Sequence, residues 1–491
     1  MTPTPGPALI LEQIDDIFQE AFNTGNFDPF FEIVAKPDLL ASILPAILEM
    51  PNDLIKADND QAIAIDNVHL ITMNGDEILE NRQILIQDGL IEAIKPAGSP
   101  VDEHFQIIEG KGAYLLPGLF DMHVHIWDRK YQSLSLAYGI TTVRHVGGWP
   151  MVLRWKKELE EGKWLGSNLF VAPAIFNGER YSNPFLHNVV SDPVVARELV
   201  RRYKEEGWDF IKVYESLEAE VYEAIIDEAG KLGIPVVCHP PESIVQKDYR
   251  RLAACITLEH AEEIFGGPLA NQFDDEKLEA VARQLKAMDA TVTLTLMNFD
   301  HLTQIGSQKQ AYVDQLPLEY LNPLVKFVID NTEGARWLNV SDMERDHNIE
   351  LNNYFLHILQ VLHEHQVNLV LGSDAGTIYT IPGLSTHDEM ALFREAGLTP
   401  YEILKTGTIN AARALGVDDQ LGSIQLGKVA DLIMVQQNPL SDISVLREPV
   451  AVIKRGQWLD QTDLQALKDS AKNPSSASLT VGRLLEHLIS K

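Results

Sequence analysis

Two histidines separated by a single residue are the first feature of this sequence that could do chemistry. His123 and His125 stand in the apolar segment PGLFDMHVHIWD of residues 117–128. Alternate residues of a β-strand face the same side, so both imidazoles would point at one place. Imidazole is a good ligand for zinc and related divalent metals. The spacing alone is weak support, because a buried histidine often satisfies only a local hydrogen bond.

Three more candidate ligands follow in other apolar, strand-like segments. They are His239 in PVVCHP, His260 in ITLEH and Asp374 in NLVLGSD. The two histidines could complete a metal site, and the Asp374 carboxylate could both bind a metal and accept a proton. The combination supports a metal site far more strongly than the His123–His125 pair does by itself.

Lys212, in the segment DFIKVYE, is the unusual member of this set. Burying a charged lysine in a protein interior without a partner costs roughly several kcal/mol of folding free energy. One explanation is an ion pair with an acid. The other is reaction with carbon dioxide to form a carbamate, an anionic ligand that could bridge two metals. The residues alone leave both explanations open.

The elements that must carry these residues alternate between strand-like and helix-like segments over residues 115–415. Eight apolar strand candidates occur in order: LLPGLFDMHVHI, TTVRHVG, NLFVAPAI, FIKVYE, PVVCHP, ITLEH, TVTLTLM and NLVLGSD. Such alternation predicts an α/β fold with a parallel sheet, and eight units predict a closed (β/α)8 TIM barrel. The candidate ligands stand at the carboxyl ends of the strands, where active sites of this barrel lie.

The two flanks of this region share a different texture of short β-like runs separated by turns. We therefore predict a small β-sandwich domain built from both flanks of the barrel. The expected divisions are a helical N-terminal extension at 1–60, the sandwich at 61–115 and 421–460, the barrel at 116–420 and a helical tail at 461–491.

Composition limits the classes of binding partner and the cellular location that we expect. The chain has 491 residues, 40 of them basic and 71 acidic, for a net charge of −31. This field disfavours nucleic acid and anionic membrane surfaces. Two cysteines, Cys238 and Cys255, make no disulfide framework, and neither a signal peptide nor an 18-residue apolar span is visible. We expect a cytoplasmic protein, and the helical ends would suit a homo-oligomer.

With these residues in view, the sequence resembles the amidohydrolase superfamily of metal-dependent (β/α)8 hydrolases. The matching segments are PGLFDMHVH, IKVY, VVCHP, LEHA and LGSDAG, followed by LGSIQLGKVADLIMVQQNPLSDI, and they span about residues 61–460. GITTVRHVGGWP and PGLSTHDEMALFREAGLTPYEILKTGTINAARALG resemble the imidazolonepropionase and Xaa-Pro dipeptidase (prolidase-like) subgroup.

The resemblance implies two divalent metals, zinc by default, with manganese, cobalt or iron possible. It implies that Lys212 is carbamylated and bridges them. His123, His125 and Asp374 would hold the first, more buried metal. His239 and His260 would hold the second. Two departures from the family pattern stand out: CHPP follows the fifth strand, and His145 replaces the acidic or amide residue common there.

The implied chemistry is attack of a metal-bound hydroxide on a substrate carbonyl. Asp374 would act as the catalytic base and pass the proton to the leaving nitrogen. Arg144 could clamp a substrate carboxylate or form a structural ion pair, and Tyr214 could donate a hydrogen bond to the substrate. His387 could face the same mouth, although Thr386 and Glu389 also fit a helix capping box there.

The long polar stretch 299–350 lies between the seventh strand and the helix before the eighth. It is a candidate lid lined by Tyr312, Tyr320 and Trp337, or else an oligomer contact.

The expected function is hydrolysis of carbon–nitrogen bonds in a small molecule: a dipeptide-like, N-acyl amino acid or cyclic amide substrate. The same metal centre could instead hydrolyse esters, lactones or phosphoesters. A catalytically dead binding scaffold is a third possibility, which the complete ligand set opposes.

Overall fold

The computed structural model describes residues 62–180, 182 and 186–484, together with a few isolated positions before residue 58. The predicted N-terminal extension therefore lies almost entirely outside the described residues, as does the end of the predicted tail. No helix in the described part of the chain has the length and apolar character needed to cross a bilayer.

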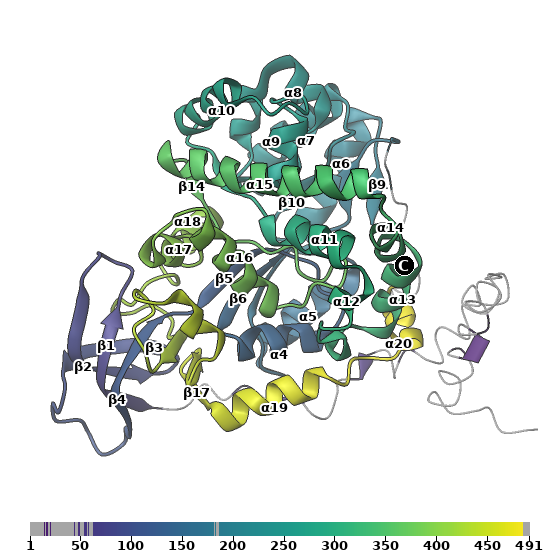
Figure 1. The fold of residues 1–491 in the computed structure, drawn as a ribbon. Coiled ribbons are helices and arrows are strands. Elements are labelled where there is room, and N and C mark those ends of the chain that lie inside the picture. Colours follow the sequence, from purple (N-terminus) through teal and green to yellow (C-terminus); the bar gives the residue numbers. More distant parts are fainter. Residues whose placement is uncertain are drawn as a thin grey trace, which may run out of the picture.

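Strands from both flanks of the chain form one seven-stranded sheet, seen in the lower left of Figure 1. The returning strand pairs antiparallel with the last strand of the first flank, and Leu432 lies opposite Pro117. Alternate residues of these strands, among them Ile65, Leu115 and Ile453, form its apolar core. The strands, in the order of the sheet, are β17 (Gln457–Asp460), β16 (Ala451–Lys454), β15 (Leu432–Val435), β4 (Gln106–Pro117), β1 (Ile63–Ile71), β2 (Ile78–Gln87) and β3 (Leu90–Pro96).

Each of the eight predicted strand segments of the middle region contains a strand, and all their ladders are parallel. The third segment, 168–175, holds one short strand and the first residue of another that ends at Asn177, and no sequence pattern predicted a further strand at His187–Val189. The strands are β5 (Leu119–Val124), β6 (Ile140–His145), β7 (Asn168–Val171), β8 (Ile175–Asn177), β9 (His187–Val189), β10 (Ile211–Val213), β11 (Val236–Cys238), β12 (Thr257–Glu259), β13 (Thr291–Thr293) and β14 (Asn368–Leu369).

The first and last of these segments lie side by side. Met122 N donates to Leu371 O over 2.8 Å, and Asp374 N donates to His123 O over 2.8 Å. Val124 and Ala375 form a parallel bridge. The two ends of the alternating region therefore meet, and this contact brings the first and last candidate ligands together.

Helices follow most of the parallel strands and lie around them (Figure 1). Local sequence sets their limits: the Asp192 side chain caps one helix, Pro193 opens it and Gly207, at φ +92°, ends it. Ser341 and Glu344 form a capping box at the start of the longest helix. The helices are α4 (Arg129–Ala137), α5 (Pro150–Glu160), α6 (Pro193–Glu206), α7 (Ala219–Leu232), α8 (Glu242–Asp248), α9 (Ala261–Gly266), α10 (Asp275–Ala287), α11 (Leu296–Gln308), α12 (Gln310–Val313), α13 (Pro323–Asn331), α14 (Glu333–Leu338), α15 (Asp342–Glu364), α16 (Leu384–Glu395), α17 (Pro400–Thr406), α18 (Ile409–Leu415), α19 (Gln461–Ala471) and α20 (Ala477–Leu484).

The stretch 299–350 is helical and packed. It runs from α11 into α15, and Tyr320 and Trp337 are buried in an apolar cluster that also contains Leu134 and Tyr379. Tyr312 lies against the same cluster and its ring is 5.3 Å from that of His301. These aromatic side chains therefore join the insertion to the body of the protein.

The cysteine prediction was wrong. Cys238 and Cys255 are joined by a disulfide between the end of β11 and the segment before β12. In the sequence the two cysteines stand in separate strand-like segments, and nothing local indicates that they pair. The fold places these two segments side by side and brings the two side chains together. The disulfide removes the cysteine-based argument for an intracellular location.

Candidate metal centre

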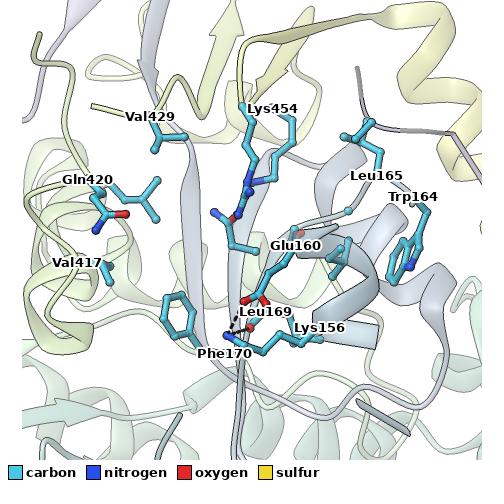
Figure 2. Close-up of a pocket in the computed structure, with 17 residues that line it drawn as sticks. Lys156, Glu160, Trp164, Leu165, Leu169, Phe170, Val417, Gln420, Val429 and Lys454 are labelled. Atoms are coloured by element: carbon cyan, nitrogen blue, oxygen red, sulfur yellow. Dashed lines mark hydrogen bonds and ion pairs between the residues drawn. The ribbon is translucent and has the colours of Figure 1, made fainter. Parts of the chain in front are cut away.

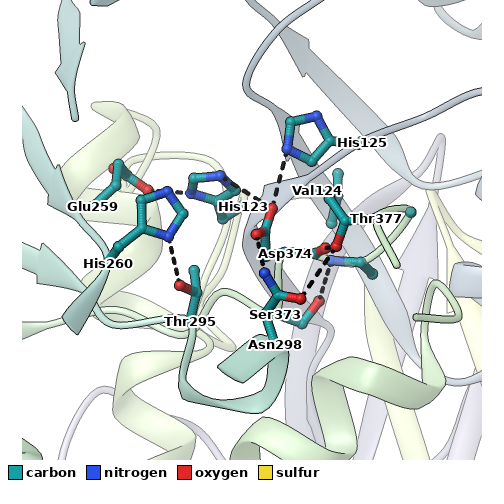
Figure 3. A network of polar contacts seen from close by, with 12 residues as sticks. His123, Val124, His125, Glu259, His260, Thr295, Asn298, Ser373, Asp374 and Thr377 are labelled. Atoms are coloured by element: carbon teal, nitrogen blue, oxygen red, sulfur yellow. Dashed lines mark hydrogen bonds and ion pairs between the residues drawn. The ribbon is translucent and has the colours of Figure 1, made fainter. Parts of the chain in front are cut away.

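His123, His125 and Asp374 converge where β5 meets the segment after β14 (Figure 3). His125 Nε2 lies 3.0 Å from Asp374 Oδ1, and His123 Nε2 lies 3.4 Å from the same oxygen. Neither contact is a hydrogen bond, and this buried oxygen accepts none from the described residues. Two imidazole nitrogens and a carboxylate oxygen thus face a common point.

His260 joins this group from the end of β12. Its ring centroid is 4.6 Å from that of His123, and its Nδ1 is 2.7 Å from Thr295 Oγ1. His260, His123 and Asp374 each offer a ligand atom, and these atoms lie within 4.8 Å of one another. His260 and Asp374 have φ values of +70° and +56°. Such conformations are uncommon for residues other than glycine and often occur at functional sites.

His239 lies at the edge of the group and also contacts acidic side chains. Its ring is 4.8 Å from that of His260 and 4.0 Å from that of Tyr214. Its Nε2 is 2.6 Å from Glu263 Oε1, while its Nδ1 is buried without a hydrogen-bond partner in the described part of the chain. Glu215, His239 and Glu263 form a second group whose ligand atoms lie within 4.8 Å of one another.

Lys212 projects from β10 into the same interior. It is 1% exposed, and its Nζ has no hydrogen-bond partner among the described residues. Burial lowers the pKa of this amine to about 8, even though the charge of Glu259 opposes the shift. About a tenth of Lys212 would then be neutral at pH 7, and neutral amine is the form that reacts with carbon dioxide.

Burial also sets the charge of the histidines. It lowers the pKa of both His123 and His260 well below the usual value, and neighbouring cationic groups, Lys212 among them, lower it further. Both imidazoles are therefore neutral near pH 7, which is the state that binds a metal.

The residues present fit a bound cation. Three buried polar atoms in this region lack a hydrogen-bond partner within the described residues: Lys212 Nζ, His239 Nδ1 and Asp374 Oδ1. Buried polar atoms of this kind are rare in folded proteins and call for an explanation. A divalent metal together with a modified Lys212 would satisfy them.

The sequence did not single out Glu259, whose carboxylate contacts Nδ1 of His123. Glu259 Oε2 is 2.5 Å from His123 Nδ1, while Oε1 accepts a 2.8 Å hydrogen bond from Arg144 Nη2. Burial by itself would raise the pKa of Glu259, but the charges of Arg144 and Lys212 hold it below the usual value. His123 Nδ1–H therefore donates to a carboxylate, which leaves Nε2 free to bind a metal.

Arg144 is held by Glu259 and by two further hydrogen-bond acceptors. Its side chain is fully buried, and its guanidinium donates to Glu259, Thr257 Oγ1 and Met122 O. The contact with Glu259 is an ion pair, which is one of the two roles that the sequence left open.

The sequence pattern around Glu259 was ambiguous, because alternation favours either Glu259 or His260 as the residue that faces the centre. Thr257 and Glu259 lie two residues apart and face the same side of β12, so strict alternation would turn His260 away. The left-handed backbone of His260 breaks the alternation. Both Glu259 and His260 can then face the centre, which a two-residue period does not predict.

Asn298 is a second residue that the sequence analysis missed. It lies in the first turn of α11, and its Nδ2 donates to Asp374 Oδ2 over 2.7 Å. Thr377 Oγ1 donates to the backbone oxygen of Asp374 over 2.7 Å. One carboxylate oxygen is thereby fixed by an amide, and the other is left facing the histidines (Figure 3).

The remaining candidates, Tyr214, His145 and His387, make different contacts. Tyr214 is beside His239, as its alternation with Lys212 predicts. His145 is buried, burial lowers its pKa to about 3, and its Nδ1 lies 2.9 Å from Ile126 N. His387 Nε2 donates to Tyr138 O over 2.9 Å, and burial lowers its pKa to about 4.

The predicted capping box at Thr386 and Glu389 was wrong. The helix begins earlier, with Gly383 at the cap position. Thr386 Oγ1 donates to Asp121 Oδ2 over 2.6 Å, and Glu389 accepts from the backbone nitrogens of Leu296 and Met297. The two side chains serve contacts between elements that the local sequence does not reveal.

Comparison with known proteins identifies a family and several similar proteins. The model of the amidohydrolase family matches residues 135–459. The chain is 35% identical over 113 residues to the ochratoxinase of Aspergillus niger, a match that spans only 22% of the length of each protein. Its structure resembles that of a bottromycin amidohydrolase, with a TM-score of 0.70 and 23% identity over 90% of this chain and 94% of the other.

A Xaa-Pro dipeptidase with bound methionine in its active site has a TM-score of 0.63 and 22% identity, over 82% of this chain and all of the other (100%). At this level of identity, the two structural likenesses show a shared fold. The family model covers more than half of the sequence, and the chain therefore belongs to the amidohydrolase family.

Proposed function

We propose that the protein is a metal-dependent hydrolase of carbon–nitrogen bonds that acts on a small-molecule amide. Dipeptide-like, N-acyl amino acid and cyclic amide substrates fit this proposal. The observation that carries it is the convergence of His123, His125, His260 and Asp374, with a buried Lys212 nearby whose Nζ has no hydrogen-bond partner among the described residues. Membership of the amidohydrolase family and the names of the similar proteins, an ochratoxinase, a Xaa-Pro dipeptidase and a bottromycin amidohydrolase, support it.

The proposed scaffold is a (β/α)8 barrel over about residues 116–420, with a β-sandwich built from 61–115 and 421–460. Parallel pairing within two sheets, one of seven strands (β8 to β14) and one of three (β5 to β7), and the backbone contacts between β5 and the segment after β14 support closure. In such a barrel the polar groups at the carboxyl ends of the strands share one mouth.

The proposed cofactor is a pair of divalent ions, zinc by default, with manganese, cobalt or iron as alternatives. His123, His125 and Asp374 would hold one ion, and His239 and His260 the other. A carbamate on Lys212 would bridge them: the neutral Nζ bonds to the carbon of carbon dioxide and releases one proton, which leaves an anionic ligand. The low pKa of Lys212 supports this modification, as does the lack of a hydrogen-bond partner for its Nζ within the part of the chain that the structure describes.

When bound, such ions supply a water of low pKa and polarise a carbonyl group. The chain's own residues would accept the proton from the attacking water and deliver it to the leaving group. Asp374 Oδ1 faces the centre and would accept the proton of the attacking water, then return it to the leaving nitrogen. Asn298 keeps Oδ2 occupied, so the base acts through one oxygen. Glu259 keeps His123 in the tautomer that presents Nε2.

Tyr214 remains the best candidate for a substrate contact, because its ring packs against His239 and the residue is half-buried at the edge of the centre. Arg144 and His387 are each committed to contacts within the protein, with Glu259 and Tyr138 respectively. We therefore propose that the substrate's charged groups are bound elsewhere around the centre.

Elemental mass spectrometry of protein purified without chelators tests the cofactor. We expect close to two equivalents of metal in the wild type, a clear fall in Lys212→Ala, and no change in Lys247→Ala, an exposed lysine on α8. One equivalent that Lys212→Ala leaves unchanged would contradict the bridged pair. Absence of metal after attempted reconstitution would contradict the whole proposal.

Paired substrates test the bond specificity. Matched amides and esters of the same acyl group should be compared in the wild type and in Asp374→Asn. We expect amide turnover to fall by about 10²–10⁴-fold in the variant, because a positioned general base contributes that much. Hydrolysis of esters or lactones with no turnover of any amide would support the alternative reaction class instead.

A further inference from the structure

A cavity at the other end of the parallel strands has features of a binding site. It has a volume of about 140 Å³ and lies between α5, the start of β7, residues 417–429 and the turn that joins β16 to β17 (Figure 2). We call it the junction cavity, because the seven-stranded sheet and the parallel strands both contribute to its wall. It lies at the amino end of β7, away from the histidines, which follow the carboxyl ends of their strands.

Two of the three basic residues that line the junction cavity are already paired. Lys454 Nζ is 2.6 Å from Asp431 Oδ2 and 2.8 Å from Asn168 Oδ1. Lys156 Nζ is 3.0 Å from Asp209 Oδ1 and 3.1 Å from Glu160 Oε1. Lys454 is 2% exposed, so the first pair is built into the interior rather than placed on the surface.

Arg455 is the third, and its guanidinium has no carboxylate partner among the described residues. Its Nε and Nη2 reach Asn168 Oδ1 only at 3.4 and 3.3 Å. Asp431 instead accepts the backbone N–H of Arg455 over 2.7 Å. This backbone bond holds Arg455 at φ +48° and fixes where its half-buried side chain begins. The fork of N–H donors is therefore positioned, and the side-chain acceptor that it has among the described residues is the neutral amide of Asn168.

The rest of the wall is mainly carbon. Phe170, Leu421 and Val429 line the cavity together with other apolar side chains. The volume corresponds to roughly four or five water molecules, which suits an organic acid with a few carbon atoms. A guanidinium fork matches a carboxylate with two parallel hydrogen bonds. The apolar wall favours a short hydrocarbon chain over the fully polar surface of a phosphate.

We propose that the junction cavity binds a small organic carboxylate, with the carboxylate group on Arg455 and the carbon chain against Phe170, Leu421 and Val429. The chain carries a net charge of −31, so its overall field repels anions. Binding of an anion would therefore depend on this local arrangement. The proposal does not depend on the metal centre or on the reaction.

Isothermal titration calorimetry of the full chain with propionate, butyrate and inorganic phosphate tests the proposal. We expect one saturable site for the carboxylates, at least tenfold weaker binding in Arg455→Gln, and unchanged binding in Arg336→Gln, an exposed arginine on α14. Arg455→Lys keeps the charge without the fork and should weaken binding to an intermediate degree. It also provides the comparison if Arg455→Gln fails to fold.

A carboxylate could also bind at the metal centre, so the titration is repeated with Asp374→Asn. We expect the carboxylate site to persist in that variant. Binding that is lost in Asp374→Asn but kept in Arg455→Gln would assign the ligand to the metal centre and overturn the proposal. So would phosphate binding tighter than either carboxylate, or no saturable binding of the acids at millimolar concentrations.

Discussion

Glu259 divides its two carboxylate oxygens between a candidate metal ligand and an arginine. Oε2 accepts from His123 and Oε1 accepts from Arg144, and all three side chains are buried. Partners of this kind orient a ligating imidazole and raise its basicity. At the scale of single residues, the centre therefore depends on groups behind the ligands as well as on the ligands.

Glu259→Gln tests this dependence. The amide keeps the shape of the side chain but removes the negative charge beside His123 and Arg144. We expect metal affinity, measured by competition with a chromogenic chelator, to fall by about 10–100-fold. Glu276→Gln, at an exposed site on α10, is the matched control. Equal affinity in both variants would mean that Glu259 serves folding alone.

His387 gives a second test, in the pH dependence of stability. Burial lowers its folded-state pKa to about 4 from the usual 6.5, so the unfolded chain binds more protons between these values. The free energy of unfolding should therefore fall as the pH drops from about 6.5 to 4, by up to about 3 kcal/mol from this residue.

Urea unfolding at several pH values measures that slope. His387→Gln should flatten it, and His347→Gln, at an exposed position of α15, should leave it as in the wild type. An unchanged slope in His387→Gln would show that His387 is protonated to the same extent in the folded and unfolded chains.

At the scale of elements, the disulfide links two neighbouring strand segments that each lead to a candidate ligand. Cys238 directly precedes His239, and Cys255 lies five residues before His260. The bond closes a loop with a sequence separation of 17. A loop of this length constrains the unfolded chain enough to contribute about 3 kcal/mol of stability.

The double variant Cys238→Ser/Cys255→Ser should therefore lose about 3 kcal/mol of unfolding free energy in denaturant titrations. Adding a reductant should destabilise the wild type by a similar amount and leave the double variant unaffected. If the reductant changes neither protein, the two thiols are not bonded in solution.

At the scale of the whole molecule, a buried ion pair in the sheet from the two flanks is linked through Asn168 to the parallel strands. Asp431 bonds to Lys454 and accepts a 2.7 Å hydrogen bond from Asn168 at the start of β7. Both charged side chains are at most 3% exposed. Removing one partner would leave the other charge buried and unpaired.

Asp431→Ala should therefore lower the free energy of unfolding by about 3–5 kcal/mol. Asp342→Ala, which removes an exposed partner of Arg345, should cost less than about 1 kcal/mol. A similar small loss in both variants would mean that the junction is held by apolar packing instead.

The sequence by itself determined the strand segments, because runs of apolar residues with polar ends mark buried parallel strands regardless of their neighbours. It also picked out His123 and His125 by strand alternation, and His260 and Asp374 as polar residues at strand ends, because both signals are local properties. The parallel pairing along the middle region follows from the same alternation of strands and helices.

Only the tertiary structure decided which distant groups meet. Glu259 with Arg144, Asn298 with Asp374, Cys238 with Cys255, and Thr386 with Asp121 are all contacts between separate elements. Their geometry depends on strand register and on backbone conformations such as the left-handed turn at His260. A local pattern cannot encode such contacts, because the partner's position is set by the packing of the whole chain.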